Sequence, residues 1–374
     1  MPERVLVTGG GGFIGSFLID ELVKLGHRVI VYDNMERQVH AAGQAENYLN
    51  PDAEYVYADI RDRDSLERAV TRSDLITHQA ALVGVGQSMY QVERYVDINI
   101  RGTSVLLDIL VNAKHNVRKV VVAASMSGYG EGRYRCPQCG LIAPPLRPEN
   151  QLLRAEWELH CATCGSILEP VPTTEDKVLQ ATSVYAITKQ TQEQLVLNVC
   201  EAFKIPAVSL RYFNVYGPRQ SLDNPYTGAA AIFMSRLKND RPPLIFEDGE
   251  QTRDFVSVHD IVAANIAVIG SPKADYRVFN VGSGTRVSVL ELSGLLARLL
   301  GKDIGPEVTG KYRKGDVRHC FADISLLQSV LDWAPQIPLA TGLRELVDWS
   351  ESISATDHVE AATQELSNRG LLIG

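Results

Sequence analysis

Three residues of the chain have the types and spacing that acid–base chemistry needs. Tyr185 and Lys189 stand four positions apart, and because residues at i and i+4 share one face of a helix, both can reach one site. A phenol with a pKa near ~10 is a poor base at neutral pH, but a nearby ammonium favours the phenolate and lowers that pKa. Ser125 ends an apolar segment, where its hydroxyl could hold a reacting oxygen beside Tyr185, and Ser127 is a second candidate. The same spacing is common on surface helices, so its meaning depends on the surrounding fold.

Four of the six cysteines fall in two Cys-x-x-Cys-Gly motifs with 21 residues between them. Each motif can form a tight knuckle that offers two thiolates, and two knuckles complete a tetrahedral zinc site. Because four thiolates leave no open position on the ion, the predicted zinc is structural; two disulfides or reducible thiols are the alternative. The segment from about 131 to 170 is therefore interpreted as a zinc-ribbon insertion. The predicted metal ligands are Cys136, Cys139, Cys161 and Cys164.

The first 34 residues contain the elements that would position a cofactor beside Tyr185. Arg4–Thr8 is an apolar run typical of a buried parallel strand, and a glycine-rich turn leads from it into a helix that ends near Gly26. A second apolar strand, 27–32, ends on Asp33. The order of strand, turn, helix, strand and acid predicts a dinucleotide-binding unit, whereas glycines alone could form a connector in another α/β protein.

Each part of this unit has a physical role in the prediction. Gly9 permits a sharp turn, Gly12 leaves room for a pyrophosphate, and Gly15 allows close packing of helix and strand. The helix N-terminus offers free N–H groups and a partial positive charge to the pyrophosphate. Asp33 can accept both ribose hydroxyls and would repel a 2′-phosphate, so NAD is favoured over NADP. The predicted cofactor-binding residues of this segment are Gly9, Gly12, Phe13, Ile14, Gly15, Asp33 and Asn34.

Strand and helix patterns continue to alternate through the first half of the chain. This predicts the fold class α/β, with a Rossmann-like doubly wound parallel sheet that binds ligands outside the carboxyl ends of its strands. Apolar strands are predicted at 55–59, 74–79, 117–124 and 207–212, and helices at 95–113 and 184–203. Residues near the strand ends and on these two helices complete the predicted cofactor site: Asp59, Ile60, Ala80, Ala81, Asn99, Tyr185, Lys189 and Tyr212.

The second half is less regular and predicts a smaller α/β domain that binds substrate. Helices are expected at 229–238, 260–269, 287–300 and 339–353. The predicted domains are residues 1–212, which bind NAD and carry the insertion, and 213–353, of which about 252–270 returns to the first domain. Residues 354–374 are polar and are expected to form a surface helix or a frayed tail.

Composition excludes several other classes of protein. The formal net charge is −8 over 374 residues, and between Glu131 and Glu158 four arginines are balanced by four glutamates, so no nucleic-acid binding is expected. No apolar run approaches the roughly 18 residues that span a bilayer, so no membrane association is expected. The first strand begins almost at Met1 and leaves no space for a signal peptide, which makes a cytoplasmic enzyme the default expectation.

These motifs together resemble the extended short-chain dehydrogenase/reductase family, in its branch of nucleotide-sugar epimerases and dehydratases. The motifs are Thr8–Gly15, Ser125 with Tyr129-Gly130, Tyr185-x-x-x-Lys189, Arg211–Pro218, Arg253–Val256 and Arg313–Arg318. The resemblance implies tightly held NAD and a catalytic triad of Ser125, Tyr185 and Lys189. It also implies a dTDP- or UDP-linked sugar as substrate, contacted by Ser127, Asn214, Arg253 and Arg313, of which the two arginines grip the diphosphate. A homodimer is expected by analogy with the family.

Two positions after Ser125 distinguish among the reactions of this family. The family's 4,6-dehydratases carry an Asp-Glu pair there, and its decarboxylases keep the Glu, whereas this chain has Met126 and Ser127. A 4-epimerase needs no such acid. The expected reaction is therefore removal of the sugar 4-OH proton by Tyr185 with hydride transfer from C4 to NAD, followed by return of the hydride to the opposite face of the 4-keto sugar.

Two other functions stay open at this point. A 4-dehydrogenase or 4-ketoreductase would use the same triad with net redox, and a non-catalytic NAD-binding sensor would have lost Tyr185 or Lys189. The position of the zinc-ribbon insertion, together with Asp33-Asn34 and Gln38-Val39-His40, is similar to the bacterial dTDP-L-rhamnose 4-epimerases of this family. The insertion leaves the predicted sheet at the edge where Ser125 lies and returns just before Tyr185. It is therefore expected to form a wall or lid over the sugar, or part of an interface.

Overall fold

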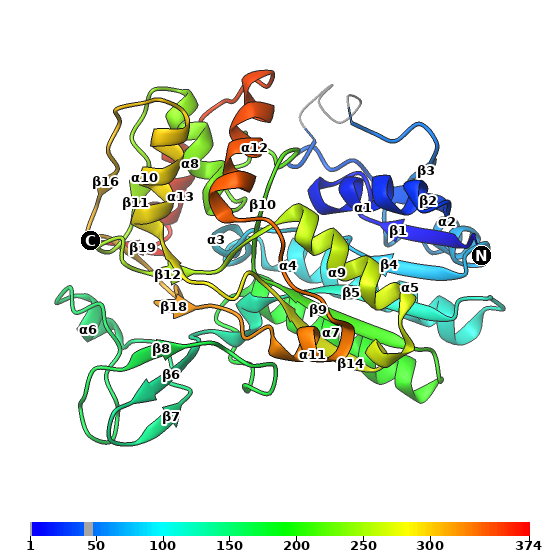
Figure 1. Ribbon diagram of the computed structural model, residues 1–374, viewed down its shortest axis with the longest axis horizontal. Coiled ribbons are helices and arrows are strands. Elements are labelled where there is room, and N and C mark those ends of the chain that lie inside the picture. Colours follow the sequence, from blue (N-terminus) through cyan, green and yellow to red (C-terminus); the bar gives the residue numbers. More distant parts are fainter. Residues whose placement is uncertain (1, 41–47) are drawn as a thin grey trace.

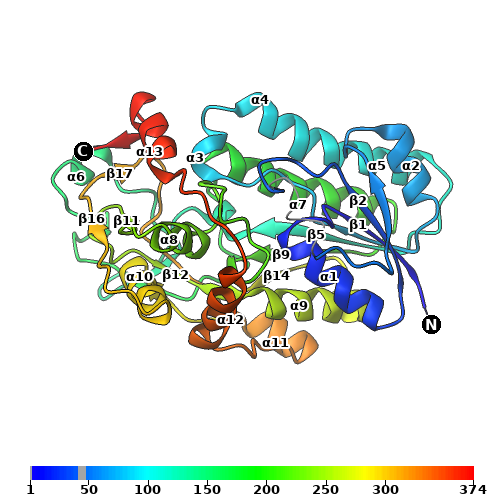
Figure 2. The ribbon, with the colours of Figure 1, turned by 90° about the horizontal axis from the view of Figure 1, so that it is seen from above.

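The fold is built on one parallel sheet, seen edge-on between two layers of helices in the computed structural model, which describes residues 2–40 and 48–374 (Figures 1 and 2). Its seven strands lie in the order β14-β9-β5-β4-β1-β2-β3, and every neighbouring pair is parallel. This arrangement confirms the predicted doubly wound sheet. The strands are β1 (Arg4–Thr8), β2 (Arg28–Asp33), β3 (Glu54–Tyr57), β4 (Leu75–His78), β5 (Lys119–Ser125), β9 (Ala207–Tyr212) and β14 (Arg277–Val281).

Side chains alternate between the two faces of the sheet, as the period of a strand requires. In β1, Val5 and Val7 pack in one buried cluster with α1 and α9, whereas Leu6 packs in another with α2, α5 and α7. Figure 2 shows these two groups of helices on opposite sides of the sheet. The helices are α1 (Phe13–Lys24) and α9 (Val258–Gly270) on one face, and α2 (Arg63–Val70), α5 (Gly102–Asn112) and α7 (Val184–Ala202) on the other.

The helix expected over 95–113 is interrupted at its N-terminal end. A single turn, α4 (Val92–Tyr95), runs into a π-helical turn, η2 (Val96–Arg101), before α5 begins at Gly102. A Cβ on Gly102 would lie 2.4 Å from the Ile60 side chain, so the small residue lets the helix approach the end of β3 closely. A short helix, α3 (Val85–Ser88), precedes this region.

The C-terminal half forms a second cluster of helices and short strands beside the carboxyl ends of the sheet (Figure 1). Its own core is apolar and includes Met234, Leu292 and Leu343. The helices of this cluster are α8 (Ala229–Lys238), α10 (Val289–Leu299), α12 (Leu339–Glu351) and α13 (Val359–Asn368), whereas α11 (Ser325–Leu331) packs beside β14 on the face of the sheet that α9 covers. The strands are β10 (Asn214–Tyr216), β11 (Leu244–Ile245), β12 (Thr252–Arg253), β13 (Phe255–Ser257), β15 (Val287–Ser288), β16 (Glu307–Val308), β17 (Tyr312–Arg313), β18 (His319–Cys320) and β19 (Leu372–Ile373).

Two parts of this half were predicted incompletely. The edge strand β14 was not predicted, and it pairs with β9 from Arg277↔Val208 to Val281↔Tyr212, so the chain returns to the sheet as well as packing α9 on it. Of the two alternatives for residues 354–374, a surface helix and a frayed tail, the structure has a helix, α13, which also buries Ala362 and Leu366 and is followed by β19, paired antiparallel with β17. The domain boundaries stay a prediction. No described helix is both long and apolar enough to cross a membrane.

The insertion has a small antiparallel sheet of its own, which projects from the molecule next to the C-terminal half (Figure 1). The strands lie in the order β7-β6-β8, and five side chains form its separate core. Its elements are β6 (Arg133–Cys136), β7 (Gly140–Ile142), α6 (Glu149–Leu152) and β8 (Glu169–Val171). The core side chains are Tyr134, Cys136, Leu159, Cys161 and Leu168.

Candidate active site

One cavity of about 570 Å³ lies over the carboxyl ends of the strands and brings together most of the predicted site residues. It extends from the glycine-rich turn, past the N-terminus of α7, to the C-terminal half. The predicted residues that line it are Gly9, Gly12, Phe13, Ile14, Gly15, Asp33, Asn34, Ile60, Ala80, Ala81, Ser125, Ser127, Tyr185, Lys189, Tyr212, Asn214, Arg253 and Arg313.

The glycine-rich turn forms a cradle that side chains would fill. Gly9 has φ +68°, and a Cβ there would lie 2.6 Å from the Ala80 amide nitrogen. A Cβ on Gly15 would lie 2.4 Å from the Gly9 carbonyl oxygen. The N-cap of α1 is Gly12, and no side chain caps the first amides of this helix. Because uncapped helix amides bind phosphate oxygens, this cradle fits the pyrophosphate of a dinucleotide.

Asp33, at the end of β2, has the environment expected of a ribose-binding carboxylate. Its two oxygens accept hydrogen bonds from the amides of Gly11 and Met35 at 2.9 Å and 2.8 Å. Burial raises the pKa of Asp33, and these hydrogen bonds together with nearby His40 oppose the rise. A carboxylate has about four acceptor positions, so two remain for ribose hydroxyls.

Tyr185 and Lys189 lie on the first turns of α7, which Ser183 caps through a hydrogen bond from the Ala186 amide. Burial raises the pKa of Tyr185 to about 12, and a hydrogen bond with Ser125 opposes the rise. Burial lowers the pKa of Lys189 to about 7. In the protein without its cofactor, removal from water governs the pKa of both groups, and the expected lowering of the Tyr185 pKa by Lys189 and a bound nicotinamide stays a prediction.

The hydroxyls of Ser125 and Ser127 line this part of the cavity, and the buried amide of Gln192, which does not line it, contacts Lys189. The Ser127 hydroxyl donates to the Ser125 oxygen at 2.9 Å, so the two serines form one pair rather than alternative sites. The Lys189 ammonium donates to Gln192 Oε1 at 3.0 Å. Gln192 in turn donates to Thr103 at 2.7 Å. Gln192 was missed, although its position three residues after Lys189 places it on the same helix face and could have indicated it.

Asn99 and Asp59 do not line the cavity, contrary to the prediction. Asn99 is fully buried in η2, where its amide group accepts from the Leu82 N–H at 2.7 Å and donates to Thr188 at 2.9 Å, so it connects this turn to α7. The Asp59 carboxylate accepts two hydrogen bonds of 2.7 Å from the Arg61 guanidinium. Arg61 thereby lowers the pKa of Asp59 and holds its carboxylate outside the cavity.

Two histidines, His78 and His259, make structural contacts within the protein. His78 is buried between the hydroxyls of Thr8 and Thr103, at 2.7 Å and 2.9 Å, and burial lowers its pKa to about 3. His259 pairs with Glu345 at 2.9 Å on α12.

The far end of the cavity carries the arginines that were expected to hold a diphosphate. Arg313 donates to Asp316 at 2.9 Å, and its guanidinium carbon lies 5.1 Å from the centre of the Phe246 ring. The Arg253 guanidinium donates to the Val317 carbonyl at 2.6 Å. Asn214 Oδ1 is buried without a hydrogen-bond partner among the described residues, so it can accept one from a ligand. This end can therefore bind an anion next to a polyhydroxylated group.

Other residues that line the cavity carried no sequence signal. Phe246 and Gln251 come from a loop between short strands, and Ala362, Thr363 and Leu366 come from α13, which was expected to be peripheral. The positions of the α13 residues depend on the pairing of β19 with β17, which joins segments far apart in the chain.

The four predicted metal ligands meet at the tip of the insertion. All four sulfur atoms lie within 4.8 Å of one another, and none forms a disulfide. A zinc ion with Zn–S bonds of about 2.3 Å would place its thiolates about 3.8 Å apart, so the donor set fits a tetrahedral ion. A hydrogen bond involving Ser166 is the main cause that lowers the pKa of the Cys164 thiol to about 6, which favours the thiolate that a metal requires.

The expected wall or lid over the sugar is wrong in one respect. None of residues 131–170 lines the cavity. The insertion packs instead against the C-terminal half, behind the segments that contain Arg253 and Arg313. Buried charges of the two regions form ion pairs at this contact.

The sequence matches the NAD dependent epimerase/dehydratase family over residues 5–151 and 159–282. It is 35% identical to a dTDP-L-rhamnose 4-epimerase of Burkholderia thailandensis, over 93% of this chain and 94% of that protein. The fold is similar to a UDP-glucose 4-epimerase of Thermotoga maritima with UDP-glucose, with a TM-score of 0.77, 31% identity and coverage of 93% and 98% of the two chains. It is also similar to a UDP-glucuronic acid 4-epimerase of Bacillus cereus in complex with UDP-glucuronic acid and NAD, with a TM-score of 0.76, 28% identity and coverage of 94% and 99%.

Proposed function

The chain belongs to the NAD dependent epimerase/dehydratase family and is an NAD-dependent nucleotide-sugar epimerase, and we propose that it inverts C4 of a dTDP-linked 6-deoxyhexose such as dTDP-L-rhamnose. The observation that carries the proposal is one cavity holding the Tyr185–Lys189 pair between the glycine cradle and the two arginines. The 35% identity to a dTDP-L-rhamnose 4-epimerase supports this substrate above others.

Tyr185 is the proposed base and acid at the sugar 4-OH. A phenol with a pKa of about 12 is a weak base, so the reaction needs nearby positive charge to stabilise the phenolate. NAD, when bound, supplies a hydride acceptor at C4 and the positive nicotinamide ring. Lys189 supplies the second positive charge when it is protonated, and its pKa of about 7 allows both of its states near neutrality. Ser125 orients the reacting oxygen toward Tyr185, and Ser127 orients Ser125.

The remaining residues hold the two ligands in place. Gly9, Gly12 and Gly15 admit the dinucleotide pyrophosphate, and Asp33 accepts from its adenosine ribose. Arg253 and Arg313 bind the sugar-linked diphosphate, and Asn214 accepts a hydrogen bond from the sugar. Binding energy from the nucleotide then keeps the 4-keto sugar in the cavity while it turns to present its other face.

Two further parts of the proposal concern the rest of the molecule. The four cysteines hold a structural zinc ion, which the sulfur arrangement and the lack of an open coordination position support. The chain forms a homodimer through the faces of α5 and α7, an inference that rests on family analogy.

The experiment is a panel of dTDP- and UDP-sugars incubated with the purified, dialysed protein without added cofactor. We expect NAD to stay with the protein and dTDP-L-rhamnose to be converted to its C4 epimer, with product stereochemistry measured by NMR. A requirement for added NAD in stoichiometric amounts would instead indicate a net-redox dehydrogenase or ketoreductase. Absence of turnover with every sugar, by protein that retains NAD, would indicate a sensor.

A UDP-hexose is the second candidate substrate. The observation that favours it is the similarity to solved 4-epimerases with UDP-sugars, at 31% and 28% identity. Faster conversion of UDP-glucose than of dTDP-L-rhamnose in the same panel would select this candidate and reject the first.

A further inference from the structure

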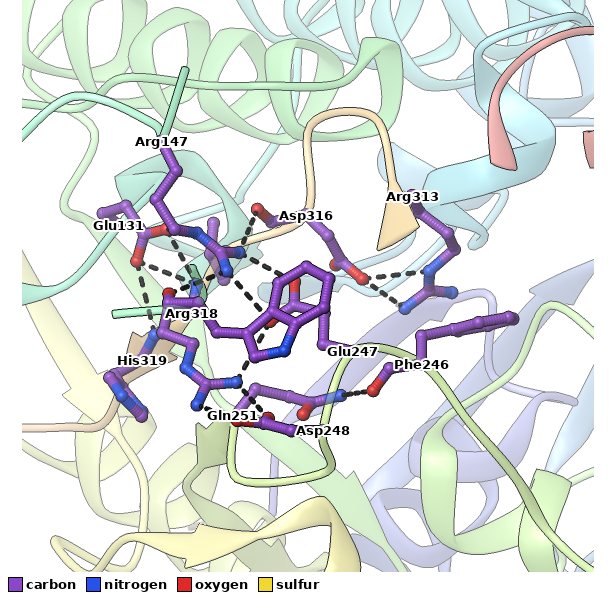
Figure 3. Close-up of polar contacts among 12 residues, drawn as sticks. Glu131, Arg147, Phe246, Glu247, Asp248, Gln251, Arg313, Asp316, Arg318 and His319 are labelled. Carbon is purple, nitrogen blue, oxygen red and sulfur yellow. Dashed lines mark hydrogen bonds and ion pairs between the residues drawn. The ribbon is translucent and has the colours of Figure 1, made fainter. Parts of the chain in front are cut away.

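A buried group of charged residues joins the insertion to the C-terminal half of the molecule. Figure 3 shows these side chains converging from both regions. Arg147 and Arg318 are the largest members, and the side chain of each is only 1% exposed. We call this group the charge cluster; it consists of Glu131, Arg147 and Glu158 from the insertion and Glu247, Asp248, Asp316, Arg318 and His319 from the C-terminal half.

Arg147 is the central cation that the insertion contributes. Its guanidinium binds both carboxylate oxygens of Glu247, at 2.9 Å and 2.8 Å. It also donates to the carbonyl of Trp157 at 3.0 Å and contacts the carbonyl of Asp316 at 3.4 Å. Such a bidentate pair fixes orientation as well as distance, because the planar fork has one matching arrangement.

Arg318 is the central cation of the C-terminal half, and it also contacts both the insertion and its own half. Its guanidinium donates to Glu158 of the insertion at 2.6 Å, to Asp248 at 2.6 Å and to Glu247 at 3.1 Å. Its backbone N–H donates to the buried carboxylate of Glu131 at 2.7 Å. Because most members have more than one partner of opposite charge, the two regions are joined through a network rather than through a single pair.

The residues that Arg147 contacts are direct neighbours of the part of the cavity lining that carries Arg253 and Arg313. We call this part the nucleotide-binding wall. Glu247 has φ +55°, a backbone conformation that a non-glycine residue keeps only when its surroundings impose it. The preceding residue, Phe246, lines the cavity and packs against the Arg313 guanidinium. Asp316 also lines the cavity and binds Arg313 through its carboxylate. A single cation on the insertion therefore contacts both segments that present Arg313.

We propose that Arg147 is a positioning residue, through which the insertion sets the affinity of the nucleotide-binding wall for the diphosphate of the substrate. Arg147 itself does not contact the substrate. The inference rests on the proposed function, because it takes Arg313 to be a diphosphate ligand. Arg147 acts on Phe246 and Asp316, and these orient Arg313. The zinc-bearing insertion then supports substrate binding by holding Arg313 in position. Binding of NAD on the coenzyme side of the cavity does not depend on the insertion.

The test compares R147M with R154A in the complete protein. Arg154 is on the same insertion and pairs with Glu156 on the surface, with side chains 56% and 48% exposed. Each variant is titrated with dTDP and with UDP by calorimetry, and its NAD content, kcat and KM are measured. For R147M we expect nucleotide affinity to fall and KM to rise by about tenfold or more, because loss of one hydrogen bond between charged groups weakens binding by about that factor. NAD content and kcat should stay near wild type, and R154A should match wild type throughout.

Two more variants keep the inference falsifiable if R147M does not fold. R147K keeps the charge without the fork and should have intermediate affinity. The double variant R147M/E247M also removes the carboxylate that loses its bidentate partner and keeps only its contact with Arg318, and it should fold yet still bind dTDP and UDP weakly. Wild-type affinity in R147M or in the double variant, or equal losses of NAD content and nucleotide affinity, would overturn the inference alone. Wild-type protein that binds neither nucleotide would overturn the proposed function and this inference with it.

Discussion

The coenzyme side and the nucleotide side of the cavity are held in shape by different kinds of interaction. On the coenzyme side, Gly9, Gly15 and Asp33 lie within one strand–helix–strand unit and act through the backbone or through its immediate neighbours. On the nucleotide side, Arg147 and Glu247 are 100 residues apart and Arg318 and Glu158 are 160 apart, and they act through buried charges. The first side depends on the absence of side chains at a few positions. The second depends on the presence of every partner in a network.

This difference has consequences for how each side responds to change. A glycine cradle fails by steric overlap, which no neighbour can relieve when the obstructing atom is backbone. A charge network fails when one partner is lost, and it recovers when the opposite charge is also removed. The predictions below test whether the two sides are independent in this way, beginning with the largest expected effect.

Tyr185→Phe should abolish the chemistry and leave both binding sides intact. Loss of a positioned acid–base group costs typically 10²–10⁴-fold, so we expect kcat to fall by about that factor. NAD content after dialysis and affinity for dTDP should not change, because the ring of Tyr185 still fills its buried position. Turnover by this variant at the wild-type rate would show that another group transfers the proton.

Gly15→Ala should break the coenzyme side alone. The new Cβ would lie 2.4 Å from the Gly9 carbonyl oxygen, so the turn must shift and NAD content should fall by about tenfold or more. The matched control is Gly270→Ala, because a Cβ there meets no atom within 4 Å. Nucleotide affinity measured with dTDP should be affected much less than NAD content. An equal loss of both would show that the two sides are coupled.

Cys139→Ser should weaken the nucleotide side. With one thiolate missing we expect zinc, measured by atomic absorption, to fall from about one ion per chain to well below that value. The insertion then loses part of its support, and dTDP affinity should fall by about threefold to tenfold while NAD content stays constant. Full zinc content in the variant would contradict the four-cysteine site.

Lys189 predicts a pH dependence of stability on the coenzyme side. The folded protein holds its pKa at about 7, whereas the unfolded chain keeps the ordinary value of 10.5. Between these values the unfolded chain binds more protons, so the free energy of unfolding should rise with pH by up to about 1.4 kcal/mol per unit. Urea unfolding of wild type and Lys189→Met at pH 7 to about 9.5 measures this slope, which the variant should lack.

The sequence was sufficient for what local patterns encode. The strand ends at Asp33, Ser125 and Tyr212 were predicted, and they meet at one edge because parallel strands share a direction. The two cysteine motifs predicted a four-sulfur cluster because short knuckles have few geometries. In each case the signal and the structure lie within a few residues of each other.

What the sequence did not predict depends on contacts that local patterns do not contain. Asn99 was predicted to bind the cofactor, and the π-helical turn η2 buries it against α7 instead. Burial, which depends on the whole fold, raises the pKa of Tyr185 in the protein without its cofactor, and the motif does not show that burial. Arg147 was counted only as one of four arginines balanced by four glutamates, and the fold shows that its side chain is enclosed.

The edge strand β14 has a consequence for any attempt to divide the protein into fragments. It covers β9 along all five of its residues, yet it lies more than sixty positions further along the chain. A fragment that stops after Tyr212 would expose a row of unsatisfied peptide groups on β9, which is a template for aggregation. Expressing the coenzyme-binding part by itself should therefore yield insoluble material, and a soluble version would have to carry residues 277–281 by circular permutation or grafting.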